Sequence, residues 1–284
     1  MDQLTLASTL ADINLPAIRF FPSLDSTNDE AWRWVAAGAP HCALVIADEQ
    51  TAGRGRLQRR WVTAPGSSLA FSLVLLSPPL TPQLVPRLTG LGALATCNAL
   101  RMKYELPAQI KWPNDILLFE RKAAGILVEA RWDGENLKAA VIGIGINIAP
   151  ESINPVSLPA EGLNFPATCV EAALGHPVER LELLHAVLVE FFTWLPQLST
   201  PGFIHHWEAC LAYLDQWVEL SVEYVDQSSR LDSVLPPIQV GKVIGLTPDG
   251  SLKLLTPSGR LVTAQVGEIR LRRSSMDQPA PSPD

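Results

Sequence analysis

The sequence contains no long hydrophobic segment. None of its apolar runs approaches the roughly 18 to 20 residues that a helix needs to cross a bilayer. The first residues, Met1, Asp2 and Gln3, lack the basic flank and the apolar stretch of a secretion signal. We therefore expect a cytoplasmic protein that does not enter a membrane.

Cysteine is scarce and scattered. The four cysteines are Cys42, Cys97, Cys169 and Cys210, which lie far apart and form no CxxC pair. A disulfide framework places its cysteines at short, regular spacings, and a zinc site usually groups its ligands in pairs. The sequence therefore predicts neither kind of site.

Basic residues are fewer than acidic ones. Lysine and arginine total 22 against 29 acidic residues, which gives a net charge of −7. A protein whose main task is to bind nucleic acid normally needs a basic surface, so this balance argues against such a task. One segment departs from the average, because Arg54, Arg56, Arg59 and Arg60 lie within seven residues. These arginines can form a local anion site in an otherwise acidic protein.

The length of 284 residues favours one large domain followed by a small one, because it is near the upper limit for a single hydrophobic core. Capping signals and apolar periodicity predict helices over 28–37, 82–102, 168–175 and from 181 to a stop at Pro196. Short apolar runs predict strands over 42–48 and 69–76 and an antiparallel meander over 108–119, 123–132 and 137–148. Further strand patterns at 217–225, 239–246, 251–256, 260–264 and 268–273 indicate a small all-β barrel. We expect an α+β fold with domains at 1–215 and 216–273, and a disordered tail at 274–284.

Three short clusters combine residues that bind anions and cations. Gly53-Arg54-Gly55-Arg56 joins glycines, which let backbone amides approach an anion, to guanidinium groups that match carboxylate or phosphate oxygens. Lys111-Trp112-Pro113-Asn114-Asp115 brings a cation, an amide and a carboxylate to a strand end, a combination that can hold phosphate and magnesium. Lys122 precedes Gly125 in the next turn. Each cluster taken alone also fits a purely structural role. The three would then be a solvated loop, a strand-end ion pair and a solvated turn lysine.

Two common nucleotide motifs are absent. Gly143-Ile144-Gly145-Ile146-Asn147 begins like a dinucleotide fingerprint, but the third glycine is missing and Pro150 follows where a helix should start. No GxxxxGK[ST] segment occurs either. The small residues more plausibly let a flat ligand lie against the strand, with Asn147 offering a donor and an acceptor, or they allow a tight sheet crossing.

Together these motifs resemble those of biotin protein ligases. The matching segments, in order, are DSTN at 25–28, QTAGRGR at 50–56, KWPND at 111–115, KAAGILVE at 122–129 and GIGIN at 143–147. The resemblance covers residues 20 to 150 and extends more weakly to Arg272, where GEIRLR looks like the end of the family's C-terminal SH3-like domain. It implies a mixed sheet flanked by helices and an enzyme that activates biotin with ATP as biotinyl-5′-AMP, releasing pyrophosphate. The biotin then passes to one lysine of a biotin carboxyl carrier protein or domain, of acetyl-CoA carboxylase or a related carboxylase.

The resemblance also implies roles for individual residues. Lys122, Arg54 and Arg56 would be catalytic. The biotin site would comprise Ser26, Thr27, Asn28 and Gln50 around the ureido ring, with Arg54, Gly55, Arg56 and Lys122 near the carboxylate. The ATP site would comprise Trp61, Lys111, Asn114, Asp115, Asn147 and Arg272. Asp115 would also bind Mg²⁺.

The chain departs from the family pattern at several points. Leu57-Gln58 replaces the usual Arg-Gly, which would stiffen the loop, and Ala70 replaces an aromatic residue of the biotin pocket. Only 24 residues precede Asp25, too few for a helix-turn-helix domain, so we expect no sequence-specific DNA binding. Residues 226–237 look like an insertion in the barrel, without a functional explanation.

Alternatives remain open from the sequence. A lipoate or octanoate ligase would share the fold, although QTAGRGR and KWPND favour biotin. A nonenzymatic nucleic-acid-binding module would use the arginine loop and the small β domain, against the acidic net charge. The protein would be a monomer or a homodimer, and a strand over 140–148 at a sheet edge would offer a pairing surface for a second copy.

Overall fold

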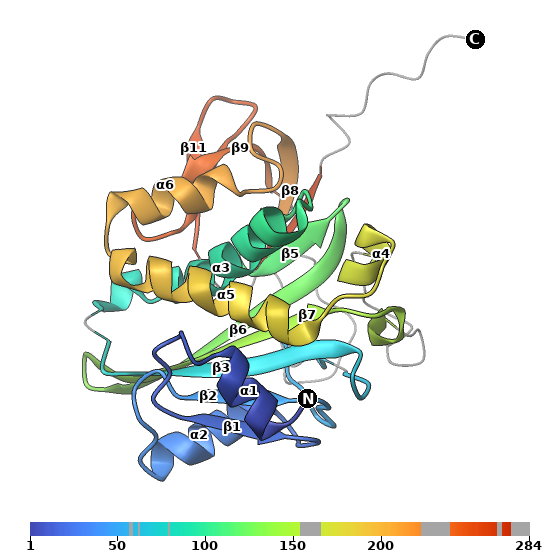
Figure 1. Cartoon of the computed structure of the whole chain (residues 1–284). Helices are drawn as coiled ribbons and strands as arrows, with labels where there is room; N and C mark the ends of the chain where they lie inside the picture. Colours follow the sequence, from blue (N-terminus) through green and yellow to red (C-terminus); the bar gives the residue numbers. More distant parts are fainter. Residues whose placement is uncertain are drawn as a thin grey trace, which may run out of the picture.

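A mixed seven-stranded sheet forms the centre of the protein (Figure 1). The computed structural model describes residues 1–56, 59–61, 63–78, 80–153, 166–222, 239–265 and 269–273. The strand order is β1-β2-β3-β7-β6-β5-β4. The strands are β1 (Ile18–Phe21), β2 (Leu44–Ala47), β3 (Ser68–Leu76), β4 (Gln109–Lys111), β5 (Asp115–Leu118), β6 (Arg121–Asp133) and β7 (Asn136–Asn147). Only β1 and β2 run parallel among these neighbours, which makes the sheet mixed as expected.

Helices cover both faces of this sheet. They are α1 (Gln3–Thr9), α2 (Thr27–Ala36), α3 (Pro86–Tyr104), α4 (Val170–Leu174), α5 (Arg180–Trp194) and α6 (Pro201–Ala209). Short 3-10 turns occur at Pro82–Leu84, Pro150–Ile153 and Leu195–Gln197. Figure 1 shows α2 below the sheet and α3 with α5 above it, and contacts of α2 with β2, β3 and β7 agree with this arrangement.

The alternation of side chains along each strand supplies both faces with apolar residues. In β7, Ile142, Ile144 and Ile146 join the large core under α3 and α5, whereas Val141 joins the smaller core under α2. In β2, Leu44 and Ile46 likewise belong to the large core. The alternate residues of each strand therefore project toward α2. On this face of β7, Val141 is followed by the glycines Gly143 and Gly145.

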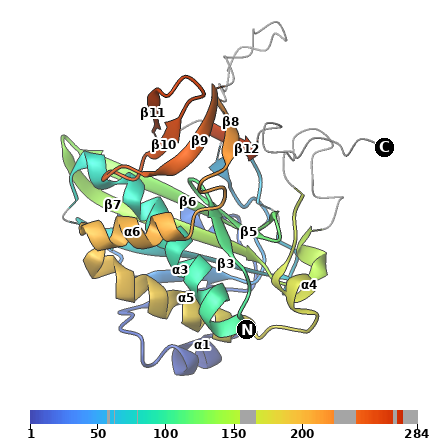
Figure 2. The same cartoon turned by 90° about the horizontal axis from the view of Figure 1, so that it is seen from above.

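A second sheet, of five antiparallel strands, lies beside α6 (Figures 1 and 2). Its order is β11-β10-β9-β8-β12, with β8 (Trp217–Val222), β9 (Gln239–Leu246), β10 (Leu252–Leu255), β11 (Leu261–Ala264) and β12 (Ile269–Arg273). This sheet is consistent with the expected SH3-like domain. The division of the chain at residues 215 and 216 stays a prediction.

Buried contacts join the second sheet to the first. The ring of Trp207 in α6 packs between Gly90 of α3 and Gly250, where a Cβ atom would lie 2.5 and 2.6 Å from ring atoms. Arg87 of α3 donates hydrogen bonds to the carbonyls of Leu198 and Pro248. The indole Nε1 of Trp112 donates to the carbonyl of Gly250 at 3.0 Å. The turn around residue 250 therefore rests on the core of the large domain.

Several sequence predictions need correction. The strand predicted over 108–119 is two strands, β4 and β5, joined by a turn at Trp112, Pro113 and Asn114. The strand predicted at 140–148 is part of β7, which ends at Asn147 and lies between β3 and β6, so both of its edges are paired and it offers no sheet edge to a second copy. Lys122 lies in β6 rather than in the turn. The helix predicted from Pro82 begins at Pro86, after a 3-10 turn.

The capping signals used to predict the helices at 28–37 and 168–175 also differ from the structure. Ser26 and Cys169 are the residues that precede α2 and α4, and neither side chain makes a capping hydrogen bond. The elements α1, β1 and α6 were not predicted from the sequence at all. Residues 226–237 and the tail at 274–284 lie outside the described residues, as do Leu57 and Gln58.

No helix in the part of the chain that the structure describes combines the length and the apolar character needed to cross a bilayer.

Candidate active site

A row of small residues crosses the α2 face of the large sheet. The strand registers pair Ala47 with Ala70, Ala70 with Gly145, Gly145 with Gly125, Gly125 with Asp115, and Asp115 with Lys111. Because directly paired residues project from the same face, this row is a floor without bulky side chains that ends in a carboxylate and a cation. Ala70, which replaces the expected aromatic residue, lies in this floor and is buried.

A buried polar cluster borders the floor where α2 begins. The Ser72 hydroxyl of β3 donates to Asn28 Oδ1 at 2.7 Å and contacts Thr27 Oγ1 at 2.8 Å. Gln50 Oε1 accepts from the backbone amide of Thr27 at 2.8 Å and from its hydroxyl at 3.1 Å. Asn28 lies so close to Gly143 that a Cβ atom there would overlap its amide. Donors and acceptors are thus fixed at one end of the floor, with Ser26 buried beside them.

Described residues of the loop between Gln50 and Thr63 pair with one another beside the floor. Gly53 O accepts from Trp61 N at 2.8 Å, and Arg59 O accepts from Gly55 N at 2.7 Å. A Cβ atom on Gly53 would overlap the Trp61 carbonyl, so only glycine fits this close approach. The backbone amide of Gln50 also donates to Thr63 Oγ1 at 2.5 Å. The loop is therefore tied at its base by the same glutamine that reaches Thr27.

The indole ring of Trp61 lies on the glycines of the floor. A Cβ atom built on Gly145 would lie 2.5 Å from Trp61 Cε2, and one on Gly125 would lie 3.3 Å from Trp61 Cζ3. The Lys122 ammonium is 5.7 Å from the ring centroid. Trp61 Nε1 is buried and has no hydrogen-bond partner among the residues that the structure describes. A buried donor of this kind is costly unless a partner arrives, which marks the ring edge as a place for a ligand acceptor.

The cations around the floor are paired with acidic and amide groups of the protein. Lys122 Nζ lies 2.6 Å from Asp115 Oδ1. Arg56 Nη1 donates to Asn114 Oδ1 at 2.8 Å. Burial lowers the pKa of the Arg56 guanidinium, and the nearby Asp115 carboxylate acts in the opposite direction. Two loops and two strands therefore bring two cations and one carboxylate to one end of the floor.

Arg54 is held by carboxylates at the other end. Its guanidinium binds Glu129 through two bonds, 2.8 and 2.7 Å long, and Nη2 also lies 2.7 Å from Asp29. Glu129 Oε2 accepts from Asn28 Nδ2 at 2.8 Å as well. Glu129 thus connects the polar cluster at α2 to the arginine loop. Bidentate arginine–carboxylate pairs fix the orientation of the guanidinium as well as its position.

The turn between β4 and β5 is anchored from three sides. Asn114 Nδ2 donates to the Ile126 carbonyl at 3.1 Å, and the Asn114 carbonyl accepts from Ile126 N at 2.9 Å. Trp112 reaches the second sheet through Gly250, as described above. Lys111 and Asp115 face each other across the turn. The Lys111–Asp115 motif therefore has a rigid backbone from which its polar side chains project.

The structure brings together most of the residues predicted for the site. The residues that meet around the floor are Ser26, Thr27, Asn28, Gln50, Arg54, Gly55, Arg56, Trp61, Lys111, Asn114, Asp115 and Lys122. Asn147 lies on the same strand face two residues beyond Gly145, and its amide donates to the Thr168 carbonyl at 3.1 Å. Arg272 lies in β12, and its side chain is outside the described part of the structure.

Three site residues were missed by sequence reasoning. Ser72 and Asp29 belong to no predicted cluster, although Asp29 directly follows the DSTN motif. Glu129 ends the KAAGILVE motif but received no role. Its place in β6 could have been derived from the alternation that begins at Gly125, because both residues project from the same face.

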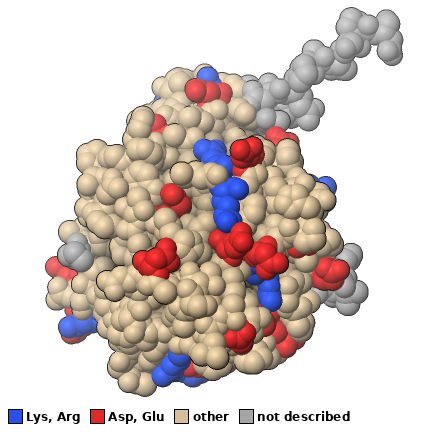
Figure 3. All heavy atoms as spheres, viewed as in Figure 1, with Lys and Arg blue, Asp and Glu red and all other residues tan. Residues whose placement is uncertain are grey.

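Charged side chains of both signs occur together on the surface of the protein. On the face shown in Figure 3, basic and acidic side chains of the described residues lie next to one another, and no broad basic area is visible there. Described residues also include no group of three or more His, Cys, Asp or Glu side chains arranged to hold a metal ion. Asp115 lies beside the Asn114 amide and belongs to no such group among these residues.

Comparison with known proteins identifies similar sequences and folds. Residues 20–147 match the biotin/lipoate A/B protein ligase family. The biotin–[acetyl-CoA-carboxylase] ligase of Paracoccus denitrificans is 35% identical over 240 residues, which are 84% of this chain and 94% of that protein. The bifunctional ligase/repressor BirA of Bacillus subtilis is 32% identical over 236 residues, 83% of this chain and 68% of its own length. A solved structure of biotin protein ligase from Aquifex aeolicus, in complex with biotin and ATP, superimposes with a TM-score of 0.71 at 28% identity, covering 92% of this chain and all of the other.

Proposed function

Because this chain belongs to the biotin/lipoate A/B protein ligase family, we propose that it is an ATP-dependent biotin protein ligase. It activates biotin as biotinyl-5′-AMP with release of pyrophosphate and then transfers biotin to a lysine of a biotin carboxyl carrier protein. The main structural support is the glycine and alanine floor, with a buried neutral polar cluster at one end and cations at the other. Such a surface suits a flat neutral ring joined to an anionic reacting centre.

The polar cluster is the proposed site of the ureido ring. Thr27 and Asn28 offer both donors and acceptors there, and Gln50 and Ser72 hold them in fixed orientations. A buried site built from hydrogen-bonding groups rejects a ligand that leaves those groups unpaired. This property favours biotin over lipoate, whose ring carries no ureido group.

The cations serve the first chemical step. The biotin carboxylate must approach the α-phosphate, and two unit charges about 4 Å apart repel each other by roughly 4 kcal/mol at an effective dielectric constant of 20. Arg56 and Lys122 border the end of the floor where these anions would meet, and Arg54 lies at the end with the polar cluster. Fixed cations in a partly buried site stabilise the charge that develops in phosphoryl transfer, because they are already oriented before the reaction.

Two of these cations are paired with carboxylates of the protein itself. Lys122 is paired with Asp115, and Arg54 with Glu129 and Asp29. Substrate anions must therefore exchange with carboxylates of the protein. Lys122 would turn from Asp115 toward the reacting oxygens, and Arg54 would remain oriented by Glu129 while it contacts the biotin carboxylate.

The residues present also suit a nucleotide with Mg²⁺. This ion is usually held by one or two carboxylates together with substrate phosphates, and Asp115 with Asn114 supplies such a partial site. When bound, the ion neutralises phosphate charge. Trp61 would pack on the adenine, Lys111 would face the phosphates, and Asn147 and Arg272 would complete the nucleotide site.

The second step is aminolysis of the adenylate by the carrier lysine. The loop between Gln50 and Thr63, whose Trp61 lies on the floor, would protect the mixed anhydride from water until the carrier arrives. Acetyl-CoA carboxylase or a related carboxylase is the proposed source of the carrier. Cytoplasmic location, a monomeric or homodimeric state and the lack of sequence-specific DNA binding stay predictions.

The decisive experiment offers the protein ATP, Mg²⁺ and either biotin or lipoate. We expect biotinyl-5′-AMP by mass spectrometry, biotin-dependent exchange of labelled pyrophosphate into ATP, and biotinylation of a purified carrier domain. A carrier domain with arginine in place of its acceptor lysine is the matched control. Lipoyl-adenylate in place of biotinyl-adenylate would favour the lipoate ligase alternative, and the lack of any adenylate from folded protein would refute the proposal.

A further inference from the structure

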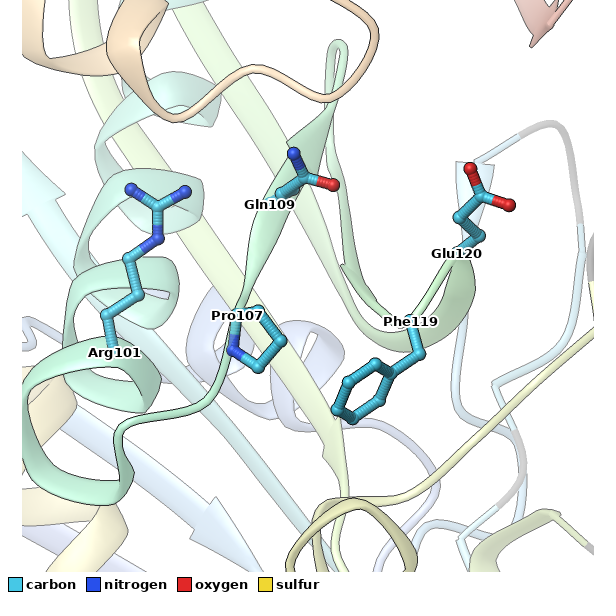
Figure 4. Close-up of a pocket in the computed structure, with 5 residues that line it drawn as sticks. All are labelled: Arg101, Pro107, Gln109, Phe119 and Glu120. Carbon is cyan, nitrogen blue, oxygen red and sulfur yellow. The ribbon is translucent and has the colours of Figure 1, made fainter.

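A hollow in the surface lies at the edge of the large sheet, beside β4 and the turn that joins β5 to β6. Figure 4 shows five residues that line it, and its volume is about 550 Å³. They are Arg101 near the C-terminal end of α3, Pro107, Gln109 of β4, and Phe119 and Glu120 of the turn. The hollow therefore combines a cation, an amide and a carboxylate with an aromatic ring.

The turn carries an exposed aromatic side chain on an unfavourable backbone. Leu118 pairs with Arg121, so Phe119 and Glu120 are the central residues of a hairpin turn, and their φ values are 50° and 58°. Such turns strongly favour asparagine and glycine, because the left-handed region costs other residues about 1 to 2 kcal/mol each. Phe119 recovers little of this cost by burial, because it is 62% exposed. The stability of the turn therefore gives no reason for a phenylalanine at this position.

Arg101 gives the hollow an oriented positive charge. Its Nε donates to the Ala108 carbonyl at 2.6 Å, and its Nη1 contacts Cys210 Sγ at 3.2 Å. These contacts hold the guanidinium in place, and within the described part of the chain none of its partners is a carboxylate. A carboxylate supplied by a ligand would therefore meet an oriented cation beside the apolar surface of Phe119 and Pro107.

The hollow is close to the proposed reaction centre. Gln109 pairs with Leu117, and Leu117 pairs with Lys122. Neighbouring strands are about 4.8 Å apart, so the backbones of Gln109 and Lys122 are separated by roughly 10 Å. A protein–protein interface commonly covers about 800 Å² of each partner, which is a patch roughly 30 Å across. A protein that brings a side chain to Lys122 can therefore contact the hollow at the same time.

The edge of β4 beside the hollow is already paired. Ile110 N donates to the Cys210 carbonyl at 2.7 Å, and the Ile110 carbonyl accepts from Ala212 N at 2.8 Å. The segment at 210–212 thus continues the ladder at this edge, where a strand of another protein would otherwise add. A partner at the hollow is therefore recognised by side chains rather than by backbone pairing.

We propose that the hollow docks the carrier domain during the second step, an inference that rests on the proposed function. The carrier presents an apolar side chain to Phe119 and Pro107 and a carboxylate to Arg101, while its acceptor lysine extends toward Lys122. The simpler alternative is that Phe119 only closes the hairpin. That alternative explains neither the exposed ring on a costly backbone nor the oriented cation beside it.

The test measures the two chemical steps separately in Phe119→Asn. Asparagine suits the left-handed turn better than phenylalanine, so the variant should be at least as stable as wild type in urea. Pyrophosphate exchange and transfer of biotin from the adenylate to hydroxylamine should be unchanged, because neither requires docking. The KM for a purified carrier domain should rise about tenfold at a similar kcat, because aromatic side chains often dominate the affinity of an interface.

Two further variants complete the test. Leu4→Asn is the matched control, because Leu4 is an exposed apolar residue of α1, which contacts β1 at the opposite edge of the sheet. Its KM for the carrier should equal that of wild type. Arg101→Gln, with its fold checked by circular dichroism, should raise the KM for the carrier about fivefold and make it less dependent on salt.

The possible failures of this inference and of the proposed function are distinct. A KM for the carrier within twofold of wild type in Phe119→Asn would overturn the inference and leave the proposed function intact. A change confined to the KM for biotin or ATP, or a changed oligomeric state in light scattering, would also overturn it, because the hollow would then serve a substrate or a second copy. Folded wild-type protein that makes no adenylate would refute the proposed function and the inference with it.

Discussion

At Gly145, a single added methyl group should disturb the proposed nucleotide site more than the proposed biotin site. In the substitution Gly145→Ala, the new Cβ atom would lie 2.5 Å from Trp61 Cε2 and 2.6 Å from Trp61 Nε1. Ordinary contacts between carbon atoms are about 3.5 to 4.0 Å, so the indole ring must move by roughly 1 Å. Gly145 does not have a positive φ, so its strand backbone accepts alanine. The strain therefore falls on the ring and on the loop that holds it.

The size of the effect follows from this geometry. Overpacking that is not relieved costs about 1 to 3 kcal/mol, and Trp61 is on a loop that can yield part of it. We expect the free energy of unfolding to fall by about 1 kcal/mol and the KM for ATP to rise about tenfold, which corresponds to about 1.4 kcal/mol. The KM for biotin should change less, because the cluster of Thr27, Asn28 and Gln50 does not contact Gly145.

Urea unfolding and biotin-dependent pyrophosphate exchange, with ATP and biotin varied in turn, measure these quantities. Gly202→Ala in α6 is the control, since its Cβ atom would lie at an ordinary contact distance of 3.6 Å from Thr200 Oγ1, and both KM values should stay unchanged. The Trp61→Ala change should remove the stability cost of the added methyl group in the double variant. A KM for ATP within twofold of wild type, or strictly additive stability changes, would refute the placement of Trp61 on the floor.

Three further predictions concern other parts of the molecule. Lys122→Met should slow adenylate formation by about 10² to 10³, since it removes one oriented cation, and Lys122→Arg should retain more activity. Pyrophosphate exchange measures the rate, and an unchanged rate in Lys122→Met would exclude Lys122 from the mechanism. Ser72→Ala should lower the free energy of unfolding by about 1 to 3 kcal/mol in urea and raise the KM for biotin, because it deletes the buried hydroxyl between Thr27 and Asn28; equal stability of variant and wild type would contradict it. The pKa of Cys210 is lower in the folded protein, at about 7, than its value near 9 in the unfolded chain, so the folded protein loses this proton at a lower pH. The free energy of unfolding should therefore rise by an amount on the order of 1 kcal/mol between about pH 7 and pH 9. The same rise in Cys210→Ser, under reducing conditions, would show that another group causes it.

Local sequence patterns predicted many elements correctly. The helices α2, α3 and α5, the meander of β5, β6 and β7, and the strand pattern of the second sheet follow apolar periodicity and turn residues that lie within each segment. The short elements α1, β1 and α6 were missed. Their stability depends on packing against other parts of the chain, such as the contacts of α1 with α5 and β1, which no local pattern records.

The site was predicted best where a motif contains its own chemistry. The arginine loop, the Lys111–Asp115 segment and Lys122 attracted attention because anion-binding and metal-binding groups are concentrated in a few residues. Glu129 was missed for the opposite reason. Its partners Arg54 and Asn28 are distant in sequence, and only the folded sheet brings the three groups together.

Patterns and motifs within the chain were enough to predict the type of most elements, the acidic balance with one local arginine cluster, and the family. The folded sheet was needed to see that Ala70, Gly145, Gly125 and Asp115 form one continuous row, that Trp61 lies upon it, and that the strand at 140–147 is internal. These features depend on strand register. A shift of one residue would turn every side chain to the opposite face, and the packing of both helical layers against the whole sheet selects the register that is observed.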